Sequence, residues 1–132
     1  MEKNKKIDFS KLRKALLSLK DGMNPPPQND RERDGAIQRF EYTFELSWKV
    51  SKKVLELNGT VSHSPKEVIR NLLQQGWIDE GELWMDFLKA RNESTHTYEE
   101  KTATEVFGCA KKFIPECEKL IERLEKESKV NG

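Results

Sequence analysis

The segment RERDGAIQRFEYTFELSWKVSKKVLELN, residues 31–58, has the clearest helical pattern in the sequence. Its large apolar side chains recur every three or four residues, a spacing that places them on one face of an α-helix. They are Ile37, Phe40, Phe44, Trp48 and Leu55. Gly59 follows and supplies a helix stop. A helix of about 28 residues is roughly 40 Å long, which is the full height of a helical bundle.

The residues before this long helix predict a shorter helix and a loop. Residues 8–20 place four apolar side chains on one face, namely Phe9, Leu12, Leu16 and Leu19. Gly22 and the run Pro25-Pro26-Pro27 then disfavour helix, so residues 21–30 are expected to form a proline-rich loop.

Two more helices are predicted in the middle of the chain. Ser64 is placed to cap the third helix, Pro65 suits its first position, and Glu67 completes a capping box. The fourth helix runs from about residue 79 to residue 91 or a little beyond. Its buried face consists of Leu83, Trp84, Phe87 and Leu88.

The fifth helix has two candidate starting points. Thr97 and Glu100 can form a capping box near its beginning, and Thr102 with Glu105 offers a later start. Pro115 interrupts the hydrogen-bond pattern of this helix. The apolar stripe keeps its phase across Pro115, so we expect a kink there and not an end.

Short connections between long amphipathic helices favour antiparallel neighbours. The sequence therefore predicts an all-α, up-and-down bundle of four or five helices in one domain, residues 1–132. Residues 127–132 are expected to fray as a terminal tail.

The composition limits the function. Charged residues make up 36% of the chain, against a typical ~25%. The 24 Lys and Arg nearly balance the 23 Asp and Glu, for a net charge of +1. This balance excludes a basic protein that coats nucleic acid. The modest hydrophobic content of 35% suggests that a partner chain completes the burial of apolar surface.

Neither targeting nor cofactor signals are found. The basic N-terminus is not followed by an apolar run, and no stretch approaches the ~20 apolar residues of a membrane span, so we expect a cytoplasmic protein that does not engage membranes. Cys109 and Cys117 lie about 12 Å apart along one predicted helix, too far for a disulfide. With two histidines, no Cys-x-x-Cys and no glycine-rich phosphate loop, no metal or cofactor is expected.

One segment, RNESTHTY at residues 91–98, has an unusual arrangement of polar side chains. Arg91 lies four residues after Phe87, on the buried face of the fourth helix, where a guanidinium needs an anionic or carbonyl partner. His96 lies five residues further on. In an unbroken helix its side chain would diverge from that of Arg91 by roughly 140°, so the two converge only if the helix ends between them.

Two interpretations of this segment remain open. If Thr97 caps the fifth helix, the unpaired backbone N–H groups there form a phosphate pocket with Arg91, and His96 is a candidate general base. Alternatively, the residues are structural. Arg91 then pairs with Glu93, Glu99 or a buried carbonyl, and His96 is a cap residue.

Other polar and aromatic side chains are expected to be structural. Glu45 can pair with Lys49 one helical turn further on. The three tryptophans at helical spacing are expected in the core or in a dimer interface; they are Trp48, Trp77 and Trp84.

Two stretches of the chain resemble the HEPN superfamily and, within it, the nucleotidyltransferase substrate-binding protein family. Residues 40–49, FEYTFELSWK, look like the second-helix signature of that family. Arg91, four residues, His96, one residue and Tyr98 are similar to the HEPN pattern of Arg, four to six residues, and His. The likeness extends from about residue 9 to residue 124.

The resemblance implies a fold similar to the helical substrate-binding domain of aminoglycoside nucleotidyltransferases. It also implies a homodimer, in which two Arg/His motifs lie along a shared cleft, and a separately encoded minimal nucleotidyltransferase as partner. In some such pairs the transferase adds AMP to the tyrosine of the motif. By this analogy Tyr98 is the acceptor.

Two hypotheses for the function follow, and whether the chain is itself an enzyme differs between them. In the first, it is a binding and docking subunit, with Arg91, Thr97 and Tyr98 as binding residues. In the second, it is a metal-independent endoribonuclease toxin, of the kind found in toxin–antitoxin pairs, that acts on RNA. His96 would then deprotonate the ribose 2′-hydroxyl, Arg91 would stabilise the charge on the phosphorane, and Asn92 would orient the phosphate or the imidazole.

Overall fold

The computed structural model describes residues 7–129, and in this range its regular secondary structure consists of helices with no strand. The all-α prediction is confirmed. The α-helices are α1 (Ser10–Met23), α2 (Asp30–Leu57), α3 (Pro65–Gln75), α4 (Gly81–Glu93) and α5 (Glu100–Glu127), and a short 3-10 turn, η2 (Ser94–His96), joins α4 to α5.

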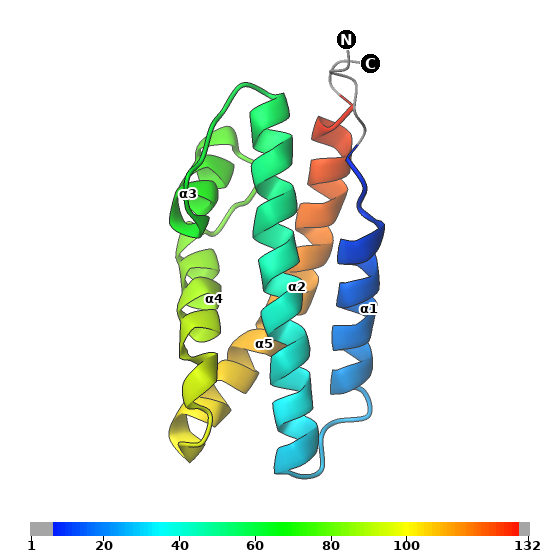
Figure 1. Cartoon of the computed structure of the whole chain (residues 1–132), viewed down its shortest axis with the longest axis vertical. Coiled ribbons are helices and arrows are strands. Elements are labelled where there is room, and N and C mark those ends of the chain that lie inside the picture. The colour runs from blue at the N-terminus through cyan, green and yellow to red at the C-terminus, as the bar shows by residue number, and fades with distance from the viewer. Residues whose placement is uncertain (1–6, 130–132) are drawn as a thin grey trace.

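The helices form the expected up-and-down bundle around α2 (Figure 1). Helices α1 and α2 run antiparallel side by side, and α5 packs against both of them. Helices α3 and α4 follow one another along the other side of α2, so that α2 contacts every other helix. The motif segment, residues 91–98, lies at the end of the bundle where α4 passes into α5.

The start of α3 follows the predicted capping chemistry. The Ser64 side chain accepts a hydrogen bond from the backbone N–H of Glu67 at 3.2 Å, and Pro65 is the first residue of α3. The Glu67 carboxylate accepts from the N–H of His63 at 2.7 Å, one residue before the cap. Gly76 ends α3 with φ 77°, a left-handed conformation that glycine adopts without strain.

The loop between α1 and α2 is shorter than predicted. Helix α1 continues through Gly22 to Met23, so the loop covers residues 24–29 and not 21–30. Gly22 lies against α2, where a β-carbon at this position would stand 3.2 Å from Cδ of Arg39. Arg39 Nη1 also donates to the backbone oxygen of Ser18 at 2.9 Å. The close approach of α2 therefore leaves little room for a β-carbon at residue 22.

The predicted cap of the fifth helix is wrong. Helix α5 begins at Glu100 and its N-cap residue is Glu99, whereas Thr97 lies in the preceding turn with φ −75° and ψ −1°, outside the extended region typical of an N-cap. The 3-10 turn at residues 94–96 is the physical reason, because the N–H of Glu99 donates to the oxygen of His96 at 3.1 Å and delays the helix. Thr102, the alternative start, lies inside α5.

Helix α5 continues through Pro115 to Glu127, as predicted. In Figure 1 it runs obliquely in its first turns and more steeply afterwards. The predicted frayed tail begins at the last residue of this helix, and its residues 130–132 lie outside the described residues. Within residues 7–129, no helix combines the length and apolarity that crossing a membrane requires.

An aromatic cluster forms the centre of the core. Phe113 of α5 meets Phe40 of α2 and Phe87 of α4 edge to face, with ring centroids 5.3 Å apart in both pairs. Trp84 packs on Phe113 at 5.6 Å, and Phe44 completes the cluster at 5.9 Å. Each such pair contributes about 0.5–1.5 kcal/mol beyond its buried area. The cluster therefore sets the position of α4 against α2.

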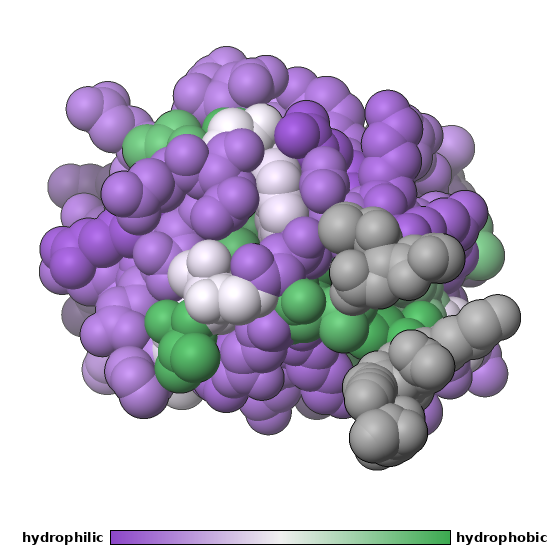
Figure 2. All heavy atoms as spheres, turned by 90° about the horizontal axis from the view of Figure 1, so that it is seen from above, coloured by the Kyte–Doolittle hydropathy of each residue, from purple (hydrophilic) through white to green (hydrophobic). Residues whose placement is uncertain are grey.

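The surface at one end of the bundle is polar, in line with the high content of charged residues. The end of the bundle at which α1 begins is mostly hydrophilic, with small hydrophobic areas (Figure 2).

Cys109 and Cys117 are both free, as their spacing predicts. Cys117 is fully buried, and this burial raises the pKa of its thiol.

Candidate functional site

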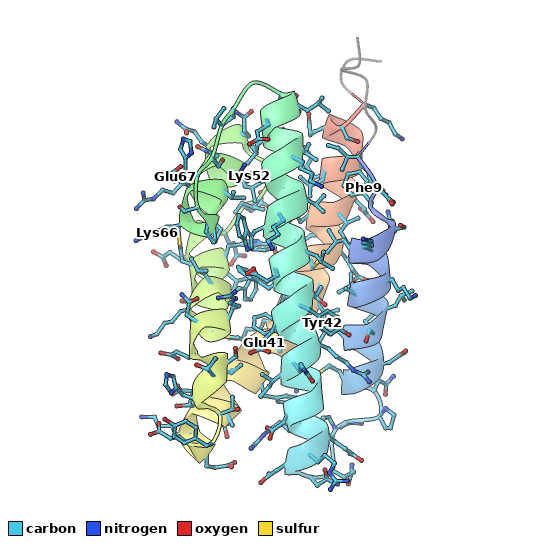
Figure 3. All side chains as sticks on the ribbon, in the orientation of Figure 1. Phe9, Glu41, Tyr42, Lys52, Lys66 and Glu67 are labelled. Carbon is cyan, nitrogen blue, oxygen red and sulfur yellow. The ribbon has the colours of Figure 1, made fainter. Side chains whose placement is uncertain are left out.

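Helix α2 directs a strip of polar side chains toward α4. Glu41, Glu45 and Trp48 follow one another at intervals of four and three residues, which places them on one face. Figure 3 shows Glu41 on the side of α2 that faces α4, and Tyr42 on the side that faces α1. The Tyr42 hydroxyl accordingly lies 2.7 Å from the Ser18 hydroxyl of α1.

The guanidinium of Arg91 is held by this strip. Its Nη2 donates to Glu45 Oε2 at 2.6 Å, and its Nη1 donates to Asn92 Oδ1 at 3.3 Å. Trp48 Nε1 donates to Glu45 Oε1 at 3.0 Å and so fixes the carboxylate from the other side. The expected partners of Arg91 are thus wrong, because its anion comes from α2. The expected pairing of Glu45 with Lys49 is also wrong, because the Glu45 carboxylate binds Arg91 and Trp48.

The end of α4 is tied to α2 by a second contact. The hydroxyl of the buried Ser94 hydrogen-bonds to the carboxylate of Glu41, and it also lies 2.7 Å from the backbone oxygen of Arg91. A hydroxyl has one proton to donate, and a carboxylate is the stronger acceptor. Glu41 and Glu45 therefore hold two points of the motif segment, one helical turn apart.

His96 and Tyr98 form a separate pair. Helix α4 ends between Arg91 and His96, which is the condition for their side chains to converge. The contact of His96 is with Tyr98, however, because its Nδ1 lies 3.1 Å from the Tyr98 hydroxyl. The two rings meet edge to face with centroids 5.7 Å apart. Tyr98 is 78% exposed, and His96 is exposed as well. Within residues 7–129, no hydrogen bond joins His96 to Arg91.

The predicted site residues thus fall into two groups. Arg91 and Asn92 belong to the group held by α2, and His96 and Tyr98 belong to the exposed turn that follows. Thr97 lies between His96 and Tyr98 in this turn, is half-buried, and does not cap α5. The chain therefore does not form the predicted phosphate pocket, which required Thr97 as the cap of α5.

A third contact from α2 holds the far side of the turn. Arg33 Nη1 donates to Glu100 Oε2 at 2.8 Å, and Arg33 also lies near Asp30 and Asp34. The hydrogen bond from Arg33 is the main reason why the pKa of the Glu100 carboxyl is lowered, and the same bond raises the pKa of Arg33. Residues 94–99 are therefore anchored to α2 at both ends.

Sequence reasoning missed the three residues of α2 that anchor the motif segment, namely Arg33, Glu41 and Glu45. The signal available was the spacing of two carboxylates one turn apart beside the apolar stripe. That spacing is equally typical of a solvated helix face, so it does not identify an inter-helix contact.

The surroundings of the site are open. Hollows of about 640 and 530 Å³ lie between α1 and α5 and between α3 and α4, and neither is lined by Arg91 or His96. In the part of the chain that the structure describes, no three histidine, cysteine or acidic side chains are grouped to hold a metal ion. The chemistry available here is that of an imidazole, a phenol and a guanidinium.

Comparisons with known proteins identify relatives of this chain. The family model described as nucleotidyltransferase substrate binding protein like matches residues 7–126. A protein of Haemophilus influenzae named "Probable ribonuclease HepT" is 29% identical over 125 residues, covering 88% of this chain and 86% of that protein.

Two solved structures are also similar. A crystal structure of a protein from Thermus thermophilus superposes with a TM-score of 0.80 at 37% identity, over 86% of this chain and 98% of that one. A Haemophilus influenzae structure, described as revealing the fold of a substrate binding domain of a nucleotidyltransferase, has a TM-score of 0.79 at 27% identity, over 89% and 99% of the two chains.

Proposed function

Because the chain belongs to the nucleotidyltransferase substrate binding protein-like family, we propose that it is the helical partner subunit of a two-component nucleotidyltransferase. In this proposal Tyr98 is the acceptor of the nucleotidyl group. The observation that carries the proposal is the exposure of Tyr98, 78%, on a turn anchored at both ends to α2. A phenol on a firmly held turn can enter the active site of another protein without unfolding its own domain.

The nucleotide itself is assigned to the partner. The sequence contains no glycine-rich phosphate loop, so the proposal places triphosphate binding on a separately encoded minimal transferase. Arg91 faces Glu45 and keeps part of its guanidinium exposed, with 39% of its side chain accessible. In this proposal the exposed part of the guanidinium is the part available to an anionic ligand.

A homodimer is part of the same proposal. Arg91 and His96 make separate contacts within one chain. A second copy packed at this end of the bundle would line a shared cleft with two sets of these side chains. Light scattering coupled to size-exclusion chromatography measures this directly, and a monomer at all micromolar concentrations would contradict the dimer.

The experiment that tests acceptor function uses the two tyrosines of the chain. The protein is purified with a candidate minimal nucleotidyltransferase from the same genome and incubated with Mg²⁺ and each α-labelled nucleoside triphosphate. Label is expected on wild type and on Tyr42→Phe, whose hydroxyl contacts Ser18 on another face. Tyr98→Phe is expected to remain unlabelled. Equal labelling of both variants would refute Tyr98 as the acceptor.

A metal-independent endoribonuclease is the second candidate, favoured by the oriented guanidinium of Arg91 and by the name of one relative. His96 would take the proton of the ribose 2′-hydroxyl, Arg91 would stabilise the phosphorane, and Asn92 would help to orient it. RNA cleavage in EDTA that falls about 100-fold or more in His96→Ala would support this activity. Unchanged cleavage in that variant would exclude it.

A further inference from the structure

The contact between His96 and Tyr98 brings two reactive side chains together on an exposed turn. The Tyr98 hydroxyl lies 3.1 Å from His96 Nδ1, within hydrogen-bonding distance. The two rings also meet edge to face, with centroids 5.7 Å apart, across the intervening Thr97. The pair therefore lies on a turn whose flanking residues, Ser94 and Glu100, are both bonded to α2.

The chemistry of the two groups is complementary. A phenol is almost wholly protonated near neutral pH and is then a weak nucleophile, whereas neutral imidazole is an effective proton acceptor in the same range. A nucleophilic hydroxyl paired with an adjacent general base is the usual arrangement for activating such an oxygen. Because both side chains are exposed, a second protein can cover the pair when it delivers a substrate.

We propose that His96 is the general base that activates Tyr98 during nucleotidyl transfer; this rests on the function proposed above. The Tyr98 oxygen forms a bond to the α-phosphorus of a nucleoside triphosphate held by the transferase, and its proton passes to Nδ1 of His96. The bond between the α-phosphorus and the bridging oxygen breaks, and pyrophosphate leaves with that electron pair. His96 is thus a catalytic residue of the transfer.

The proposal requires one tautomer of His96. Nδ1 must accept from the phenol, so the neutral ring carries its proton on Nε2. This can be tested on the chain alone by ¹⁵N NMR of the imidazole nitrogens, with His63, the other histidine, as the internal control. The expected result is an unprotonated Nδ1 at His96, with a tautomer balance that moves toward that of His63 in Tyr98→Phe. A proton on Nδ1 of neutral His96 would overturn the proposal.

The kinetic test uses the full chain in complex with its transferase at saturating triphosphate. The labelling rate of Tyr98 is expected to fall about 100-fold or more in His96→Ala and to stay unchanged in His63→Ala. Imidazole added to the buffer is expected to restore part of the rate in His96→Ala, which a merely structural role would not allow. A wild-type rate in His96→Ala, or a loss that imidazole does not rescue, would overturn the assignment.

The two proposals fail in different ways. If Tyr98→Phe is labelled as wild type is, the acceptor function fails and the role of His96 fails with it. If Tyr98→Phe is unlabelled while His96→Ala reacts at the wild-type rate, the acceptor function stands and only the role of His96 is refuted.

Discussion

Among single residues, Glu45 has the clearest measurable role, because it faces both Arg91 and Trp48. We expect Glu45→Gln to lower the free energy of unfolding by roughly 1 kcal/mol, since it removes the charge from a partly screened ion pair. A double-mutant cycle with Arg91→Gln, measured by urea unfolding, should give a coupling of about 0.5–1 kcal/mol.

The matched control is an ion pair within α2, the helix that carries Glu45. Lys52 and Glu56 lie 2.6 Å apart at i and i+4, and their coupling should be only about 0.3–0.5 kcal/mol. A coupling between Glu45 and Arg91 no larger than this would show that the contact does not hold the guanidinium.

The residues of the site illustrate how far sequence reasoning extends. Arg91 was recognisable because its spacing from Phe87 places it on the buried side of a helix. Its partner was not recognisable, because Glu45 meets it only through the packing of α4 against α2. That packing depends on the aromatic cluster, whose register no local spacing encodes.

At the scale of elements, the ion pair between Arg33 and Glu100 joins the start of α2 to the start of α5. The pKa of Glu100 is lowered below its ordinary value of 4.5, chiefly by the hydrogen bond from Arg33. A depressed carboxyl pKa stabilises the fold above the ordinary value, and this contribution is lost as the pH falls through the lowered one.

We therefore expect wild type to be more stable than Glu100→Gln at neutral pH, with the difference disappearing in acid below pH 4.5. Thermal unfolding of both proteins across this range measures the effect. Glu99→Gln, which removes the neighbouring carboxylate outside this pair, is the control. A stability difference that stays constant down to strongly acidic pH would contradict the linkage.

The helices themselves were predictable, whereas two of their ends were not. The periodic apolar stripes and the Ser64 cap act within one helix, so the sequence displays them directly. The end of α1 and the start of α5 depend on other elements. Gly22 stays helical because α2 packs against it, and Thr97 is no cap because the chain first makes a 3-10 turn.

For the whole molecule, the net charge bears on what the protein can bind, and the packing of the core bears on its stability. A net charge of +1 gives no general attraction for polyanions, so the recognition that we propose depends on local groups such as Arg91. Those groups are held in place by the aromatic core shared among α2, α4 and α5. The position of the motif segment is therefore a property of the whole bundle and not of residues 91–98 alone.

Phe113 tests this dependence, since its ring lies at the centre of the cluster and is fully buried. We expect Phe113→Ala to lower the free energy of unfolding by about 3–5 kcal/mol, a large part of the roughly 5–15 kcal/mol of a typical domain. Urea unfolding measures the loss. Phe107→Ala, on the same helix but half-buried, should cost clearly less.

The site should respond to the same change. Where Phe113→Ala remains folded, α4 loses its fixed position against α2, so the coupling between Arg91 and Glu45 should fall toward zero. Phe107→Ala should leave that coupling intact, because its ring lies outside the aromatic cluster, near Lys111. An undiminished coupling in folded Phe113→Ala would mean that the motif segment is positioned by its own contacts with α2, independently of the core.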